Sequence, residues 1–89
     1  NLPGLDRRAS EGQYHYRLGL ILEGEGRVAE AMAEHRKAIA VDRAPGKAEI
    51  NLGTLLARQG RLVEARAHLE RGVALDPQSA IASATARWS

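Results

Sequence analysis

Three histidines are the residues of this 89-residue chain whose chemistry would first suggest a metal site. His15, His35 and His68 are far apart in the sequence, so no two of them lie one helical turn apart. A zinc site needs three or four ligands and partners that orient them, and the chain has no cysteine to complete a set. His15 and His35 occupy packing positions that could approach each other. We therefore expect structural or solvated histidines, with no metal and no cofactor.

Hydrolytic chemistry would need a nucleophile beside a base, or two carboxylates in defined environments. None of the serines lies in the strand-turn-helix setting of a nucleophile elbow. The acidic pairs Glu23/Glu25 and Glu30/Glu34 are expected on solvated helix faces. The sequence therefore predicts no catalytic residue, and we expect that the chain is not an enzyme.

A glycine-rich stretch at 18–31 could be taken for a phosphate-binding loop. However, Gly19 and Gly24 are not followed by the Lys-Ser or Lys-Thr of a P-loop, and the third glycine of a dinucleotide fingerprint is missing after Gly26. An acid at Glu25 would repel a phosphate. The glycines are therefore expected to have structural roles.

Charge and composition exclude other classes of function. Thirteen basic residues face eleven acidic ones and are interspersed with them, so no basic stripe for nucleic acid is expected. The apolar runs are too short for membrane insertion. The absence of cysteine suits a reducing compartment, which favours a cytoplasmic location, or a periplasmic one if a parent protein carries an export signal. Frequent Arg, Ala and Gly are typical of a GC-rich bacterial genome.

The glycine-rich stretch recurs further along the chain, since LGLILEGEGRVAEA begins at Leu18 and LGTLLARQGRLVEA begins at Leu52. This spacing is a period of about 34 residues, a size that indicates stacked structural units which bury their apolar faces together. The identical pairs are Leu18/Leu52, Gly19/Gly53, Leu22/Leu56, Gly26/Gly60, Arg27/Arg61, Glu30/Glu64 and Ala31/Ala65, extended by Gly12/Gly46, Ala33/Ala67, Ala40/Ala74 and Asp42/Asp76.

Each unit has the apolar spacing of two helices. We expect helices over 13–24, 28–42, 47–58 and 62–75, within units spanning 12–45 and 46–79. Residues 1–11 are expected to be an irregular lead-in, with the helix beginning between Asp6 and Ser10. Residues 80–89 are expected to form a capping helix or the start of a further repeat.

The repeated glycines have two expected roles. Gly26 and Gly60 are expected to end a helix in a left-handed conformation. Gly19 and Gly53 are expected to let paired helices touch, so Gly19→Leu would overpack the contact at a cost of about 1–3 kcal/mol. Gly24 has no counterpart, because Arg58 takes its place.

The motif formed by these residues resembles the tetratricopeptide repeat, a helix-turn-helix unit of about 34 residues. Each copy carries Leu-Gly-x-x-Leu, a turn glycine, Glu-Ala, and a final Ala-(Val/Leu)-Asp. The chain departs from the pattern at His15 and Glu49, where the family usually has a large aromatic residue. The resemblance implies an all-α fold: a helical-repeat α-solenoid of two repeats plus the C-terminal capping helix.

The resemblance also implies a function as a scaffold or adaptor that binds a peptide or helix of a partner protein in a concave groove. Tyr16, Leu20 and Ile50 would give an apolar strip flanked by Lys47 and Arg58, a mixture that suits a hydrophobic anchor accompanied by an acidic group. Carried over residue by residue, the groove candidates are Gln13, Tyr16, Leu20, Glu23, Lys47, Ile50, Asn51, Thr54, Ala57 and Arg58.

Several alternatives remain open from the sequence. The chain could be an accessory domain of a larger enzyme or of a secretion or assembly protein. It could also be a self-associating structural module or homo-oligomer, since two repeats are fewer than the three usually needed. RNA binding by the related pentatricopeptide design is disfavoured, because that repeat is about one residue longer.

Overall fold

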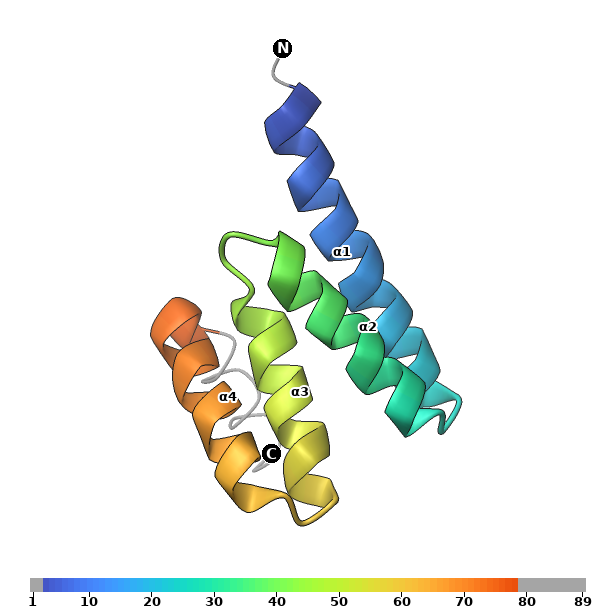
Figure 1. Cartoon of the computed structure of the whole chain (residues 1–89), viewed down its shortest axis with the longest axis vertical. Helices are drawn as coiled ribbons and strands as arrows, with labels where there is room; N and C mark the ends of the chain where they lie inside the picture. The colour runs from blue at the N-terminus through green and yellow to red at the C-terminus, as the bar shows by residue number, and fades with distance from the viewer. Residues whose placement is uncertain (1–2, 79–89) are drawn as a thin grey trace.

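The chain folds into two helical hairpins. The computed structural model describes residues 3–78, with side chains from Ser10 onward. The described residues form the helices α1 (Pro3–Gly24), α2 (Val28–Val41), α3 (Gly46–Arg58) and α4 (Leu62–Leu75). α1 packs against α2, α3 packs against α4, and α2 lies beside α3 (Figure 1). No strand occurs between residues 3 and 78, so the expected all-α fold is confirmed.

The helix ends agree with the expected ranges except at the N-terminus. α1 begins at Pro3, so the expectation of an irregular lead-in up to Asp6–Ser10 is wrong for the described residues. Proline is tolerated in the first helical turn, where its missing N–H would have no partner, and no further proline interrupts α1. The first turns of α1 consequently project beyond α2 (Figure 1). The capping helix expected at 80–89 lies outside the described residues.

The two hairpin turns are built in the same way. Gly26 and Gly60 have φ values of 78° and 79°, the left-handed conformation expected of them. The backbone N–H of Gly26 donates to the carbonyl of Glu23 at 3.0 Å, and that of Arg27 donates to the carbonyl of Leu22 at 2.9 Å. This pair of bonds is the Schellman motif, which satisfies the last carbonyls of a helix. The prediction that these glycines form the turns is confirmed.

Gly19 and Gly53 lie where the two helices of each hairpin come closest. A Cβ atom at Gly19 would lie 2.6 Å from Cε1 of His35, and one at Gly53 would lie 2.7 Å from Cγ of Leu69. Both distances are shorter than carbon atoms tolerate, so only glycine fits without movement of the neighbour. Their expected role as helix-contact sites is confirmed.

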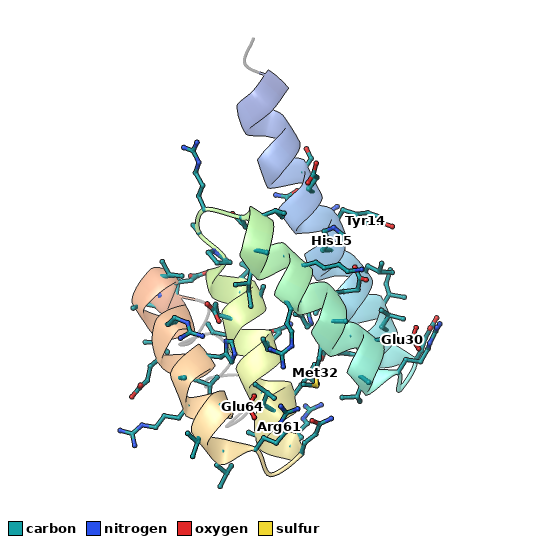
Figure 2. The ribbon with its side chains drawn as sticks, viewed as in Figure 1. Tyr14, His15, Glu30, Met32, Arg61 and Glu64 are labelled. Atoms are coloured by element: carbon teal, nitrogen blue, oxygen red, sulfur yellow. The ribbon has the colours of Figure 1, made fainter. Side chains whose placement is uncertain are left out.

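Each turn is followed by an arginine that binds a glutamate one helical turn later. Arg61 Nε donates to Glu64 Oε1 at 2.9 Å, and Arg27 Nε donates to Glu30 Oε1 at 2.8 Å. Figure 2 shows Arg61 and Glu64 at the outer end of the second hairpin. These side chains are about half exposed, so solvent screens each pair and each adds little to stability.

The apolar core joins the two hairpins. Its buried members come from all four helices, and Leu52, Leu55 and Leu56 of α3 form its centre. Small residues such as Ala31 and Ala65 let the helix axes approach. The full buried cluster comprises Leu22, Ala31, Met32, Leu52, Leu55, Leu56 and Ala65. The core thereby fixes α1 and α3, the two helices that carry the expected groove residues, in one arrangement.

Candidate partner-binding surface

A hollow of about 240 Å³ opens where α1, the end of α2 and the start of α3 meet. Gln13 and Tyr16 reach it from α1, and Lys47 reaches it from α3. These three residues come from different hairpins and line one hollow; that they bind a partner stays a prediction. The other residues that line it are Gly12, Arg17, Ala38, Asp42, Ala44, Pro45, Ala48 and Asp76.

The side chain of Tyr16 on α1 forms a hydrogen bond with that of Asn51 on α3. The pKa of its hydroxyl is raised above the ordinary value, first because burial disfavours the phenolate and then because the carboxylates of Glu23 and Asp76 repel it. A hydrogen bond with the side chain of Asn51 acts in the opposite direction. Three expected groove residues, Tyr16, Glu23 and Asn51, therefore interact around one hydroxyl group.

Glu23 also has a structural task. Its Oε2 lies 2.8 Å from Nε2 of His35, a side chain with 0% exposure. Because a carboxylate only accepts hydrogen bonds, His35 carries its proton on Nε2. Nδ1 of His35 is the one buried side-chain nitrogen or oxygen atom of the described residues without a hydrogen-bond partner. Glu23 thus links the groove side of α1 to the interior of the first hairpin.

The remaining candidates on α1 and α3 differ in how much surface they offer. Gln13, Lys47 and Arg58 are exposed, and Leu20 is 40% exposed. Thr54 is half-buried, and its hydroxyl donates to the carbonyl of Ile50 at 2.9 Å. Gln13 and Lys47 line the hollow, whereas Leu20, Thr54 and Arg58 lie outside its lining.

Ile50 does not line this surface as expected. Its exposed fraction is 7%, because its side chain is drawn into the contact between α3 and α4. A Cβ atom at Gly72 would lie 2.5 Å from Cγ1 of Ile50. The first hairpin has Ala38 at the position of Gly72, so the glycine makes the room that Ile50 fills.

The histidines bind glutamates of the neighbouring helix. Nδ1 of His15 lies 2.7 Å from Oε1 of Glu34, and Nδ1 of His68 lies 2.6 Å from Oε1 of Glu49. Among the described residues, no group of three or more His, Cys, Asp or Glu side chains could hold a metal ion. The histidines thus have a structural role, which they perform in His–Glu pairs between the helices of each hairpin.

These pairs correct the expectation for the acids. Glu34 and Glu23 are not simply solvated, since their side chains are 13% and 24% exposed and each accepts a histidine hydrogen bond. Glu25 and Glu30 do lie on an exposed face and bind Arg27. The missed signal was the spacing of 19 residues between His15 and Glu34, which recurs between Glu49 and His68.

Two aspartates that line the hollow, Asp42 and Asp76, were not among the groove residues predicted from the sequence. A Cβ atom at Gly12 would lie 3.1 Å from Cβ of Asp42, and one at Gly46 would lie 2.5 Å from Cβ of Asp76. In each repeat unit, Gly12 or Gly46 near its start thus lies against the aspartate near its end. Asp42 also accepts a hydrogen bond from the backbone of Ala44 at 3.1 Å. The signal was present in the sequence, because both the glycine and the aspartate recur in the second unit.

Two similar hairpins that repeat every 34 residues can be compared with known repeat families. Residues 22–87 match the family model of the tetratricopeptide repeat. The chain belongs to the tetratricopeptide repeat family. No curated protein and no solved structure matches it.

Tetratricopeptide repeats generally mediate contacts between proteins, and the family is generally non-catalytic. Within the described residues, no helix of this tetratricopeptide repeat chain is both long enough and apolar enough to cross a membrane. At the positions where the family usually has a large aromatic residue, this chain places His15 and Glu49, each of which pairs with a residue of the second helix.

Proposed function

We propose that the chain binds a segment of a partner protein on the surface formed by α1 and α3 around Tyr16, and that it contributes binding and no catalysis. The hollow that opens there carries the proposal, because it brings together Gln13, Tyr16 and Lys47 from the two hairpins. The core holds both helices in place, so a partner would meet a preformed surface and would not have to order it.

The surface favours a partner with an apolar anchor beside an acidic group. Tyr16 and Leu20 offer the apolar contact, and Lys47 and Arg58 are exposed cations on α3. Asn51, half-buried beside the Tyr16 hydroxyl, can offer its amide to a backbone or carboxylate oxygen of the partner. Ile50 has no part in this proposal because it is buried.

A paired capture experiment tests the proposal. The wild-type chain and a Tyr16→Ala/Leu20→Ala/Asn51→Ala variant are immobilised and exposed to the same cell extract, and the retained proteins are quantified. We expect the variant to lose the specific partners, since truncation of central anchors costs about 2 kcal/mol or more each.

The matched control is Val63→Ala, which truncates a side chain of α4 that is 87% exposed. This control should retain the same proteins as the wild type, and circular dichroism should show the same helical content for all three chains. Equal retention by the triple variant and the wild type would show that the proposed surface is wrong.

A further inference from the structure

The outer face of α1 is apolar and uncovered by the described residues. We define it by Tyr14, Leu18 and Ile21, which follow one another at helical spacing. Tyr14 is 62% exposed and Ile21 is 58% exposed, while Leu18 is half-buried. Figure 2 shows Tyr14 pointing away from the other helices.

The same face of α3 shows what such a surface does when it is covered. Ala48, Leu52 and Leu55 are the counterparts of Tyr14, Leu18 and Ile21 in the second unit, and they are 4%, 0% and 1% exposed. α2 packs beside α3, and its Met32 belongs to the same buried cluster as Leu52 and Leu55. The same helix face is therefore buried in an interface on α3 but is not covered by any described residue on α1.

The shape of the α1 face fits a side chain from a helix. A hollow of about 320 Å³ lies on it, lined by Leu18, Ile21 and Tyr14 together with Ser10, Gln13 and Arg17. In the covered counterpart, the buried Met32 supplies the large side chain, and its small buried neighbour on the same helix is Ala31. Small neighbours let the helix axes approach while the larger side chain fills the gap.

A second copy of the chain is a poor occupant. Its α4 is the counterpart of α2, but Arg66 stands at the position of Met32. Arg66 Nε binds Glu70 Oε2 at 3.1 Å, and these side chains are 80% and 66% exposed. Docking α4 onto the α1 face would bury that charged pair against Leu18 and Ile21, which is unfavourable.

We infer that the outer face of α1 is a second interaction surface, separate from the surface around Tyr16, and that it docks an amphipathic α-helix of a partner protein built like α2. That helix carries a methionine-sized or leucine-sized side chain next to an alanine. The interface α2 makes with α3 within this chain is the template for the contact.

A peptide with the sequence of residues 27–42 is the probe, because it contains the helix that covers the equivalent face. It is labelled and blocked at both ends. A side-chain link between positions 30 and 34 holds it helical, because in the folded chain these side chains bind Arg27 and His15. Binding to the full chain is followed by fluorescence anisotropy. We expect saturable binding that Ile21→Glu weakens at least about tenfold.

Two matched controls separate this contact from others. Val63→Glu on α4, at a side chain that is 87% exposed, should leave binding unchanged. A probe with Met32→Arg, which copies the residue at position 66, should bind the wild-type chain at least about tenfold more weakly. The urea midpoint of the Ile21→Glu chain should equal that of the wild type, because Ile21 is 58% exposed and outside the buried core.

Three outcomes would overturn the inference. They are no saturable binding up to about 1 mM probe, equal binding to the Ile21→Glu chain, or a concentration-dependent dimer in sedimentation that Ile21→Glu abolishes. The second outcome would mean that the probe displaces α2 from its own hairpin. The third would assign the face to a second copy.

Discussion

At the scale of single residues, the two hairpins use the same His–Glu pair in opposite orders. His15 of α1 binds Glu34 of α2, whereas Glu49 of α3 binds His68 of α4, at corresponding positions of the two units. A base on the second helix joins each pair, since Lys37 binds Glu34 at 3.0 Å and Arg71 binds Glu49 at 3.1 Å. Each hairpin thus joins its two helices through one acid and one histidine, in opposite orders.

Exchanging the first pair tests whether the order matters. His15→Glu alone places two carboxylates side by side and should lower the free energy of unfolding by about 1–3 kcal/mol. Adding Glu34→His recreates the order of the second hairpin, with Lys37 at the position from which Arg71 reaches Glu49, and should recover most of the loss. Urea denaturation of the three chains measures this. An exchanged chain no more stable than the single variant would mean that the two sites differ in more than order.

Glu34 makes the free energy of unfolding depend on pH in the acidic range. Its pKa is lowered, first by the hydrogen bond from His15 and then by the one from Lys37. The folded chain thus holds the proton less tightly than the unfolded chain, so the stabilisation is present above the ordinary pKa of 4.5 and is lost as pH falls through the folded-state value. Urea midpoints measured from pH 7 downward should fall less for Glu34→Gln than for the wild type. Parallel profiles would contradict the pairing.

Tyr16 gives the opposite dependence at alkaline pH. Its raised pKa, caused first by burial, means that the neutral hydroxyl is preferred in the folded chain. The stabilisation is complete below the ordinary value of 10.0 and is lost as pH rises through the folded-state pKa. Tyr14→Phe leaves Tyr16 as the one tyrosine, and its phenolate absorbance should appear above pH 10.0 in the folded chain and at a lower pH in urea. A folded-state midpoint at or below the midpoint in urea would show that Tyr16 is solvated.

At the scale of helices, two glycines of α1 have different surroundings: Gly19 lies in close contact with α2, and Gly24 faces open space. Gly19→Ala would place a Cβ atom 2.6 Å from the ring of His35, which is 0% exposed and held by Glu23. We expect a loss of about 1–3 kcal/mol in the free energy of unfolding. Gly24→Ala meets no atom within 4 Å and should stabilise the helix end by about 0.5–1 kcal/mol. Thermal melts of both variants provide the measurement, and a destabilised Gly24→Ala chain would reveal a role that the packing does not show.

Helix positions were predictable from the sequence because the glycine and proline residues at helix ends agree with the spacing of the apolar residues. Gly26 and Gly60 adopt the left-handed turn, and Pro45 ends the second connection just before Gly46 begins α3. The start of α1 was not predictable to the same degree, because Pro3 can stand inside a first turn as well as before a helix. Where the residues on both sides of a helix end favour a helix, no residue type in the sequence indicates where the helix begins.

The candidate surface was predictable only in outline. The resemblance to the repeat family predicted Gln13, Tyr16 and Lys47 on one surface, and all three line the hollow. Ile50 was misplaced because its burial depends on Gly72, a residue on another helix whose difference from Ala38 has its effect only once the helices pack. The His–Glu pairs were missed for the same reason, since partners so far apart in the sequence share no local pattern.

At the scale of the whole molecule, one apolar core runs through both hairpins. Buried residues from α1, α2, α3 and α4 form one cluster, and Leu52 at its centre has 0% exposure. The stability of such units is the sum of what each unit contributes by itself and what the interface with its neighbour contributes. We therefore expect the two hairpins to unfold together.

Leu52→Ala tests this coupling. Removing a fully buried leucine should lower the free energy of unfolding by about 2–5 kcal/mol, and because unfolding is shared, amide hydrogen exchange should accelerate to a similar extent in α1 and α4. The matched control is Leu62→Ala, at a leucine that is 66% exposed, and it should change neither helix by more than about 0.5 kcal/mol. Faster exchange confined to α3 and α4 would show instead that the first hairpin stays folded without the second. The lost Leu52 side chain would then lower the stability of the second hairpin alone.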